Sequence, residues 1–143
     1  MAIRSVAHYA PGRDVDWARV APAAGALEPS RLAECVEETK RDAESAGLVA
    51  PIVGHVGDGN FHVSPLIDMD DPDEIARVEA FVARLVERAL AMEGTCTGEH
   101  GVGQNKMKYL EAEHGAGALG LMRTLKRAID PSNIMNPGKI VAL

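Results

Sequence analysis

The 143-residue sequence has no apolar run close to the roughly 20 residues that a membrane-spanning helix requires. Its N-terminus also lacks the apolar core of a secretory signal peptide. The only two cysteines, Cys35 and Cys96, do not have metal-site spacing, so we expect reduced thiols. Lys and Arg number 15 against 21 Asp and Glu, and the net charge of -6 argues against nucleic-acid binding, because phosphates would be repelled. These features predict a cytoplasmic protein without a membrane span.

The length and the 46% content of hydrophobic residues are sufficient for one domain with a real core. The first 29 residues differ from the rest, because they contain Pro11, Pro22 and Pro29 and show no sustained hydrophobic period. We therefore expect an irregular N-terminal arm over residues 1–29 and a folded domain over residues 30–143.

Hydrophobic periodicity and capping signals predict the secondary structure of the folded domain. The expected elements are helices at about 31–46, 72–93, 105–113 and 116–129 and strands at about 49–57, 60–67 and 95–98. A helix, a hairpin, a second helix and a short strand make up most of a split βαβ, or ferredoxin-like, unit. The predicted fold class is thus α+β: a partial ferredoxin-like antiparallel sheet with helices on one face and a helical C-terminal tail.

The strand that would open this unit is expected to be missing. The equivalent stretch, near residues 25–29, is too rich in Pro, Ala and Gly to pair convincingly. An unpaired sheet edge or an exposed apolar face would result, and proteins often cover such surfaces by dimerisation. We therefore expect a homodimer.

The segment Gly54-His55-Val56-Gly57-Asp58-Gly59-Asn60-Phe61-His62 carries the strongest functional signal. Asp58-Gly59 between two apolar runs is typical of a two-residue type I′ hairpin loop. With that loop, His55 would lie opposite His62, with Cβ atoms about 5 Å apart. Strand alternation would then sort the side chains into a polar face with His55, Asn60, His62 and Ser64 and a core face with Val56, Phe61 and Val63.

A second polar segment, Gly98-Glu99-His100-Gly101-Val102-Gly103, offers a third ligand. Glycines flank an adjacent acid and base, which favours a tight loop that presents both side chains. Two imidazoles and one carboxylate are a recurrent ligand set for divalent ions such as zinc or manganese, so we predict His55, His62 and Glu99 as metal ligands. His100 would remain free as a general base. The alternative is that each histidine is an ordinary surface or hydrogen-bonded residue.

Three segments resemble, in order, the C-terminal part of FAD-linked 2-hydroxyacid dehydrogenases and oxidases of the vanillyl-alcohol-oxidase-like superfamily, such as D-lactate dehydrogenases, D-2-hydroxyglutarate dehydrogenases and the flavin subunits of glycolate oxidases. The segments are 54–62, 98–103 and Asp130-Pro131-Ser132-Asn133-Ile134-Met135-Asn136-Pro137-Gly138-Lys139-Ile140. The resemblance runs from about residue 30 to residue 143. It implies that His55, His62 and Glu99 bind a divalent metal, which holds the substrate's carboxylate and hydroxyl. It also implies that His100 takes the hydroxyl proton while a hydride leaves for FAD.

The resemblance further implies a large FAD-binding domain with a glycine-rich phosphate loop, and these 143 residues supply no such loop. Asn136 would contact the flavin, whereas the residues around it are otherwise typical of a helix stop followed by a short terminal strand. The expected function is the substrate- and metal-binding part of an FAD-dependent D-2-hydroxyacid dehydrogenase, which converts a small 2-hydroxy acid (D-lactate or glycolate) to the 2-oxo acid. This part would be inactive alone or completed by a separate FAD-binding polypeptide. The alternatives are a divalent-metal-binding module and the structural remnant of a truncated gene.

Overall fold

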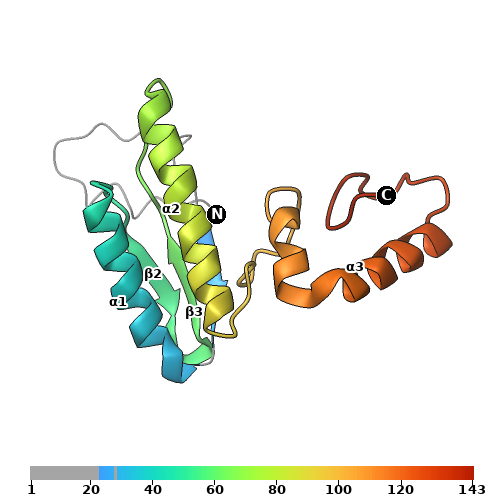
Figure 1. The fold of residues 1–143 in the computed structure, drawn as a ribbon, viewed down its shortest axis with the longest axis horizontal. Coiled ribbons are helices and arrows are strands. Elements are labelled where there is room, and N and C mark those ends of the chain that lie inside the picture. The colour runs from blue at the N-terminus through green and yellow to red at the C-terminus, as the bar shows by residue number, and fades with distance from the viewer. Residues whose placement is uncertain (1–22, 28) are drawn as a thin grey trace.

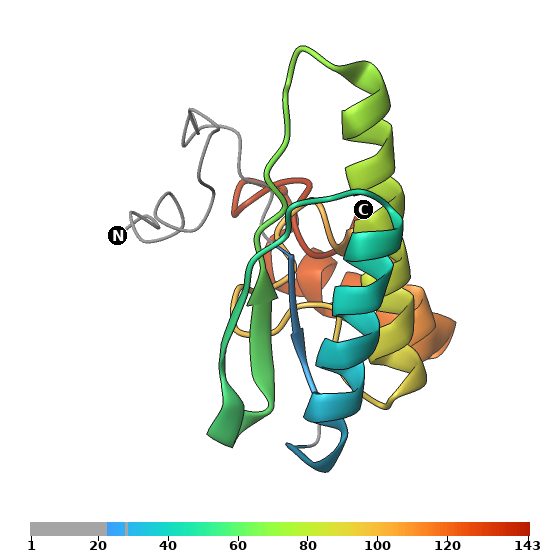
Figure 2. The same ribbon diagram turned by 90° about the vertical axis from the view of Figure 1, so that its left-hand side faces the viewer.

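The computed structural model describes residues 23–27 and 29–143, and Figures 1 and 2 show a small antiparallel sheet with two helices on one face. The elements, in chain order, are β1 (Ala23–Ala26), α1 (Pro29–Ser45), β2 (Ile52–His55), the 3-10 turn η3 (Val56–Asp58), β3 (Asn60–Val63), α2 (Pro72–Ala91), the 3-10 turn η4 (Met107–Tyr109) and α3 (Leu110–Ile129). The predicted α+β class with a helical tail is confirmed. Residues 1–22, most of the expected arm, lie outside the described residues. None of the described helices has the length and apolarity needed to cross a membrane.

The first strand corrects the expectation that the opening strand is missing. β1 pairs with β3 in antiparallel register, from Ala23↔Val63 to Ala26↔Asn60. The strand order β1-β3-β2 leaves β3 between the two strands that α1 connects, which is the split βαβ arrangement. The premise of the predicted homodimer is therefore wrong. The strand predicted over 95–98 is also wrong, because only Thr95 forms an isolated bridge there.

The main core lies between the sheet and the two helices that cover it. α2 begins where Asp71 caps it, with its side chain accepting hydrogen bonds from the backbone N–H groups of Asp73 and Glu74. The centre of its buried face is Phe81, which is completely buried. Around it pack Leu27, Leu32, Cys35, Ala43, Leu48, Phe61, Val63, Val78, Leu85 and Met92. β3 thus turns Phe61 and Val63 to the core, as alternation predicts, and its other face is available for polar side chains.

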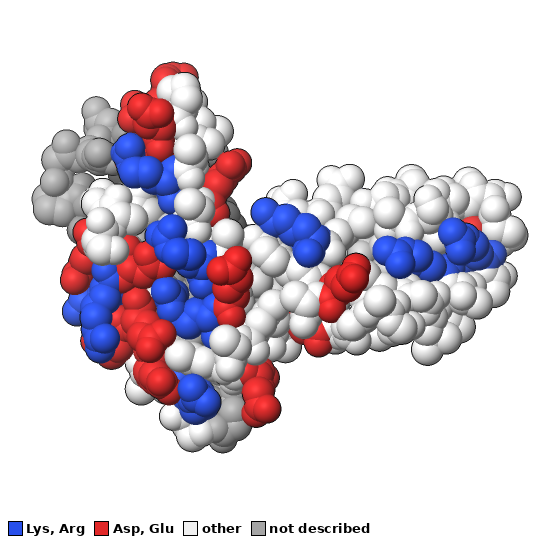
Figure 3. Space-filling view, in the orientation of Figure 1, with Lys and Arg blue, Asp and Glu red and all other residues white. Residues whose placement is uncertain are grey.

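A group of charges joins the outer sides of α1 and α2. Asp42 on α1 accepts from Arg84 Nη2 at 2.6 Å and from Arg88 Nη2 at 2.9 Å. Arg88 also donates to the hydroxyl of Thr39, which is fully buried. Figure 3 shows Lys, Arg, Asp and Glu side chains gathered over these two helices, whereas the surface over α3 carries fewer charges.

The C-terminal third extends away from the sheet as α3 and an irregular tail (Figure 1). α3 is kinked at Gly115, where φ is +79°, so the two helices predicted over 105–113 and 116–129 meet at this glycine. A second core cluster attaches α3 to the end of α2 and consists of Val86, Cys96, Leu110 and Leu119. The tail folds back, and the backbone N–H of Ile140 donates to the carbonyl of Gly103 at 2.8 Å.

Candidate metal centre

The turn between β2 and β3 differs from the predicted two-residue loop. The observed register pairs His55 with Asn60 and Val53 with His62, so His55 and His62 are diagonal neighbours and not opposed. The chain reverses through η3 and through Gly59, which has a left-handed φ of +67°. The observed register differs from the predicted one by two residues, and a two-residue shift keeps the side chains of the paired strands on their faces. Val56, which was predicted to face the core, instead lies in η3 and is 71% exposed. His55, Asn60 and His62 therefore still share the face away from the core.

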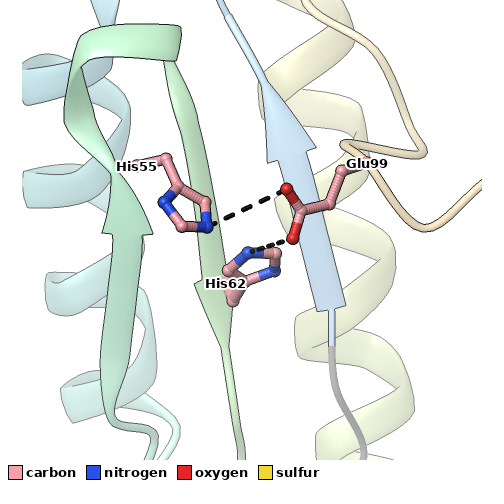
Figure 4. A group of neighbouring side chains, drawn as sticks. All are labelled: His55, His62 and Glu99. Carbon is pink, nitrogen blue, oxygen red and sulfur yellow. Dashed lines mark ion pairs between the residues drawn. The ribbon is translucent and has the colours of Figure 1, made fainter. Parts of the chain in front are cut away.

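The structure brings together the three side chains that the sequence predicted as ligands. Figure 4 shows His55 projecting from β2, His62 from β3, and Glu99 from the loop on the side of β1. His62 Nε2 lies 3.3 Å from Glu99 Oε1, and His55 Nε2 lies 3.9 Å from Glu99 Oε2. The set is accessible from one side, since the side chains of His55 and Glu99 are 61% and 54% exposed while that of His62 is 15% exposed.

Asn60 is a member of this group that the sequence placed on the right face without assigning it a role. Its Nδ2 donates to Glu99 Oε2 at 3.1 Å, which draws the carboxylate toward β3. The residue is only 5% exposed, and its Oδ1 is buried without a hydrogen-bond partner among the described residues. Because Asn60 directly faces His55 in the ladder, the hairpin register itself was the signal that could have identified it.

His100 follows Glu99 and stacks its ring on that of His62. The two ring centroids are 4.8 Å apart and the ring planes are inclined by 17°. Burial lowers the pKa of His62, and the neighbouring His100, His55 and Lys106 lower it further, although Glu99 opposes them. A lowered pKa keeps the His62 imidazole neutral near pH 7, and the neutral form is the one that binds a metal.

The donor set fits a divalent metal ion. One atom each of His55, His62 and Glu99 lies within 4.8 Å of the other two. Ligand atoms at metal bond lengths of about 2.0–2.2 Å lie roughly 3–4 Å apart, so small side-chain rotations suffice to close the site. His62 Nδ1 is buried and has no hydrogen-bond partner among the described residues, so this ring retains an unused polar atom.

Asn136, the residue predicted to contact the flavin, lies outside the cluster of His55, His62 and Glu99. Asn136 is exposed in the tail after α3, where its φ is +47°. The tail reaches the site loop through the hydrogen bond from Ile140 to Gly103, and no described contact joins Asn136 to the histidine cluster. The contact of Asn136 with FAD therefore stays a prediction.

Comparison with known proteins gives the family context. The model of the family described as FAD linked oxidases, C-terminal domain, matches residues 24–140 and so includes all of β1 except Ala23. The chain is 52% identical over 114 residues to a Danio rerio protein named probable D-lactate dehydrogenase, mitochondrial, covering 80% of this chain and 23% of that protein. It is 49% identical over 115 residues to D-lactate dehydrogenase (cytochrome) 1, mitochondrial, of Saccharomyces cerevisiae, covering 80% and 19%. It is 41% identical over 113 residues to glycolate oxidase subunit GlcD of Bacillus subtilis, covering 79% and 24%.

Proposed function

Because this chain belongs to the family of FAD-linked oxidase C-terminal domains, we propose that it is the substrate- and metal-binding part of an FAD-dependent D-2-hydroxyacid dehydrogenase. The chain spans about a quarter or less of the length of the relatives it matches, so we propose the activity for the whole enzyme and not for this part by itself. Two of those relatives are named D-lactate dehydrogenases and one is a glycolate oxidase subunit, which supports D-lactate or glycolate as the substrate. The observation that carries the proposal is the convergence of His55, His62 and Glu99 at one end of the sheet.

Each residue of the cluster has a separate role in this proposal. His55, His62 and Glu99 would hold a divalent ion, which supplies a Lewis acid for the carboxylate and hydroxyl oxygens of the substrate. Asn60 keeps the Glu99 carboxylate oriented through its 3.1 Å hydrogen bond. His100, exposed beside His62, is placed to accept the hydroxyl proton as a general base.

The reaction converts the CH–OH group of the acid to a carbonyl. The O–H proton passes to His100, the C–H hydrogen departs with its two electrons, and a C=O double bond forms. FAD, bound by another part of the protein or by a separate polypeptide, supplies the acceptor for that hydride. The stacked rings of His62 and His100 hold the proton acceptor next to a ligand, so one face of the hairpin serves both binding and deprotonation.

The first experiment asks whether the chain holds a metal and a flavin. Protein isolated under native conditions should contain close to one equivalent of zinc or manganese by elemental analysis, together with a flavin spectrum that D-lactate or glycolate bleaches. One equivalent of metal without flavin, together with no oxidation of D-lactate or glycolate after a flavin-binding partner is added, would favour the metal-binding module, which the same cluster supports. A protein with neither would contradict both functions.

The second experiment tests the ligands directly. His62→Ala should abolish binding of added Zn²⁺ or Mn²⁺ in a calorimetric titration and leave the circular dichroism spectrum unchanged, because a ligand facing away from the core contributes little to packing. Val53→Ala is the control, since Val53 faces His62 across the ladder, is exposed and offers no ligand atom. Retained metal in the His62 variant would remove the ligand assignment.

A further inference from the structure

A set of polar contacts holds the loop that carries Glu99. The backbone N–H of Cys96 donates to Glu113 Oε2 at 2.9 Å, and Glu113 belongs to the first part of α3. One residue later, the carbonyl of Thr97 accepts from Lys106 Nζ at 3.1 Å. Two charged side chains from farther along the chain thus bond to the backbone of two adjacent residues, which lie three and two positions before the proposed ligand Glu99.

The carbonyl of Thr97, to which Lys106 donates, belongs to the turn that carries Glu99. Thr97 O also accepts from the backbone N–H of His100 at 3.2 Å, so Glu99 occupies the third position of a four-residue turn. Gly98 precedes it with a φ of +54°, a backbone conformation that residues other than glycine rarely adopt. Lys106 thus bonds to the first carbonyl of the turn whose third residue is Glu99.

The charged groups of Glu113 and Lys106 lie where burial removes part of their hydration, which costs free energy. Glu113 has a 9% exposed side chain, Cys96 is completely buried, and Lys106 is half-buried. Burial lowers the pKa of Lys106. Burial and a hydrogen bond between the thiol and Glu113 raise the pKa of Cys96 to about 12. Apolar side chains in these positions would avoid the desolvation cost of the charges. The polar contacts therefore point to a requirement for a fixed loop geometry and not only for stability.

We infer that Lys106 and Glu113 are positioning residues of the candidate metal centre, which hold the backbone at Cys96 and Thr97 so that Glu99 reaches His62 and His55. This inference rests on the proposed function, because it assumes that the three side chains bind a metal. Neither Lys106 nor Glu113 belongs to the set of three candidate ligands. They act through the turn at residues 97–100.

Whether Lys106→Met weakens or strengthens metal binding distinguishes a positioning role of Lys106 from a purely electrostatic one. Lys106 lies within electrostatic reach of His62, so loss of its positive charge alone would strengthen the binding of a cation. Positioning predicts the reverse: Lys106→Met should weaken Mn²⁺ binding to the full chain by about 10-fold to 100-fold. Lys108→Met removes the same charge from an exposed position two residues away and should change the affinity by no more than about twofold.

A Glu99→Gln background tests whether Lys106 acts through Glu99. There the second substitution, Lys106→Met, should have little further effect on the affinity, because the carboxylate that it positions is already gone. Co²⁺ provides a readout that global stability does not affect: its visible absorption should change in shape with Lys106→Met and resemble that of Glu99→Gln. Equal losses in both backgrounds, or an unchanged Co²⁺ spectrum, would overturn the inference.

Variants of Glu113 provide a second, independent test in case Lys106→Met fails to fold. Glu113→Gln keeps an oxygen that can accept from the Cys96 N–H, and it should retain most of the metal affinity, whereas Glu113→Leu should lose it as Lys106→Met does. Glu111→Leu, at an exposed position on the same helix, is the control. If the unmodified chain binds no Mn²⁺ or Co²⁺, the proposed metal centre fails and this inference with it. If that chain binds metal and the Gln and Leu variants bind equally well, only the positioning role is wrong.

Discussion

Gly54 shows how tightly the hairpin that carries the candidate metal centre is packed. A Cβ at this position would lie 2.4 Å from the carbonyl oxygen of Asn60 and 2.8 Å from the Cα of Phe61. Both atoms belong to the backbone of β3, so the clash cannot be relieved by moving a side chain. Glycine is therefore required here for the close approach of β2 to the strand that bears His62.

Gly54→Ala should destabilise the protein by about 3 kcal/mol, because the two strands must separate to admit the methyl group. Gly57→Ala is the matched control, since nothing lies within 4 Å of a Cβ built there, and it should change stability by no more than about 0.5 kcal/mol. Urea unfolding of the two variants measures the difference. Equal midpoints would show that the strands are not as close as described.

The lowered pKa of His62 predicts a pH dependence of stability. Burial and the neighbouring histidines disfavour the imidazolium in the folded state, so the unfolded chain takes up this proton at a higher pH than the folded protein. The contribution of His62 to the free energy of unfolding of the metal-free protein should therefore be fully present above the unfolded pKa of about 6.5 and be lost as the pH falls toward the folded pKa. His62→Gln should remove this decline, and urea unfolding from pH 8 to pH 5 with a chelator present tests it. A wild-type curve that rises toward acid pH would contradict the sign.

Among the elements, the hairpin explains why the sequence predicted the cluster while its register was wrong. Asp58-Gly59 favoured a two-residue loop, but η3 makes the connection longer and Gly59 alone has a left-handed φ. The resulting shift of two residues preserves the alternation of faces, so His55 and His62 stay neighbours. A shift of one residue would have turned the histidines toward the core.

β1 and the loop at 95–101 were beyond local sequence rules for a different reason. An Ala- and Gly-rich segment has little intrinsic strand preference, and β1 forms because β3 offers it a free edge of backbone hydrogen-bonding groups. The approach of Glu99 to β3 depends on contacts made by Lys106 and Glu113, which lie 7 and 14 positions beyond Glu99. Such contacts belong to tertiary structure, so the sequence supplied the ligands and not their placement.

The link between α1 and α2 depends on Asp42. Burial raises the pKa of this carboxyl, but hydrogen bonds from Arg84 and Arg88 lower it by more, and the net shift is downward. Asp42→Ala should cost about 1–2 kcal/mol of stability at pH 7, because Arg84 and Arg88 would both lose this carboxylate, although Arg88 would keep its contact with Glu38 at 3.3 Å. Glu34→Ala breaks the exposed pair with Arg31 and should cost less than about 0.5 kcal/mol. Thermal unfolding of both variants measures the two losses of stability. Equal losses would show that Asp42 does not link the two helices.

The molecule as a whole has two cores joined by the loop that forms the candidate metal centre. One core lies between the sheet and its helices, and the other attaches α3 beside Cys96. The proposed ligands come from both sides of this junction: His55 and His62 belong to the sheet, and Glu99 belongs to the loop leading to α3. The geometry of the site therefore depends on how firmly α3 is held.

Leu119 and Leu121 test this dependence on one helix with one residue type. Leu119 is 5% exposed within the second core, whereas Leu121 is 60% exposed. Leu119→Ala should cost about 2–4 kcal/mol and Leu121→Ala less than about 0.5 kcal/mol. Because the cavity lies in the second core, hydrogen exchange should speed up in α3 and in residues 95–106 of the Leu119 variant, while the β2–β3 amides stay protected. Uniform loss of protection across both cores would show that the chain unfolds as one unit, and the site would then depend on the stability of the entire domain and not on the attachment of α3.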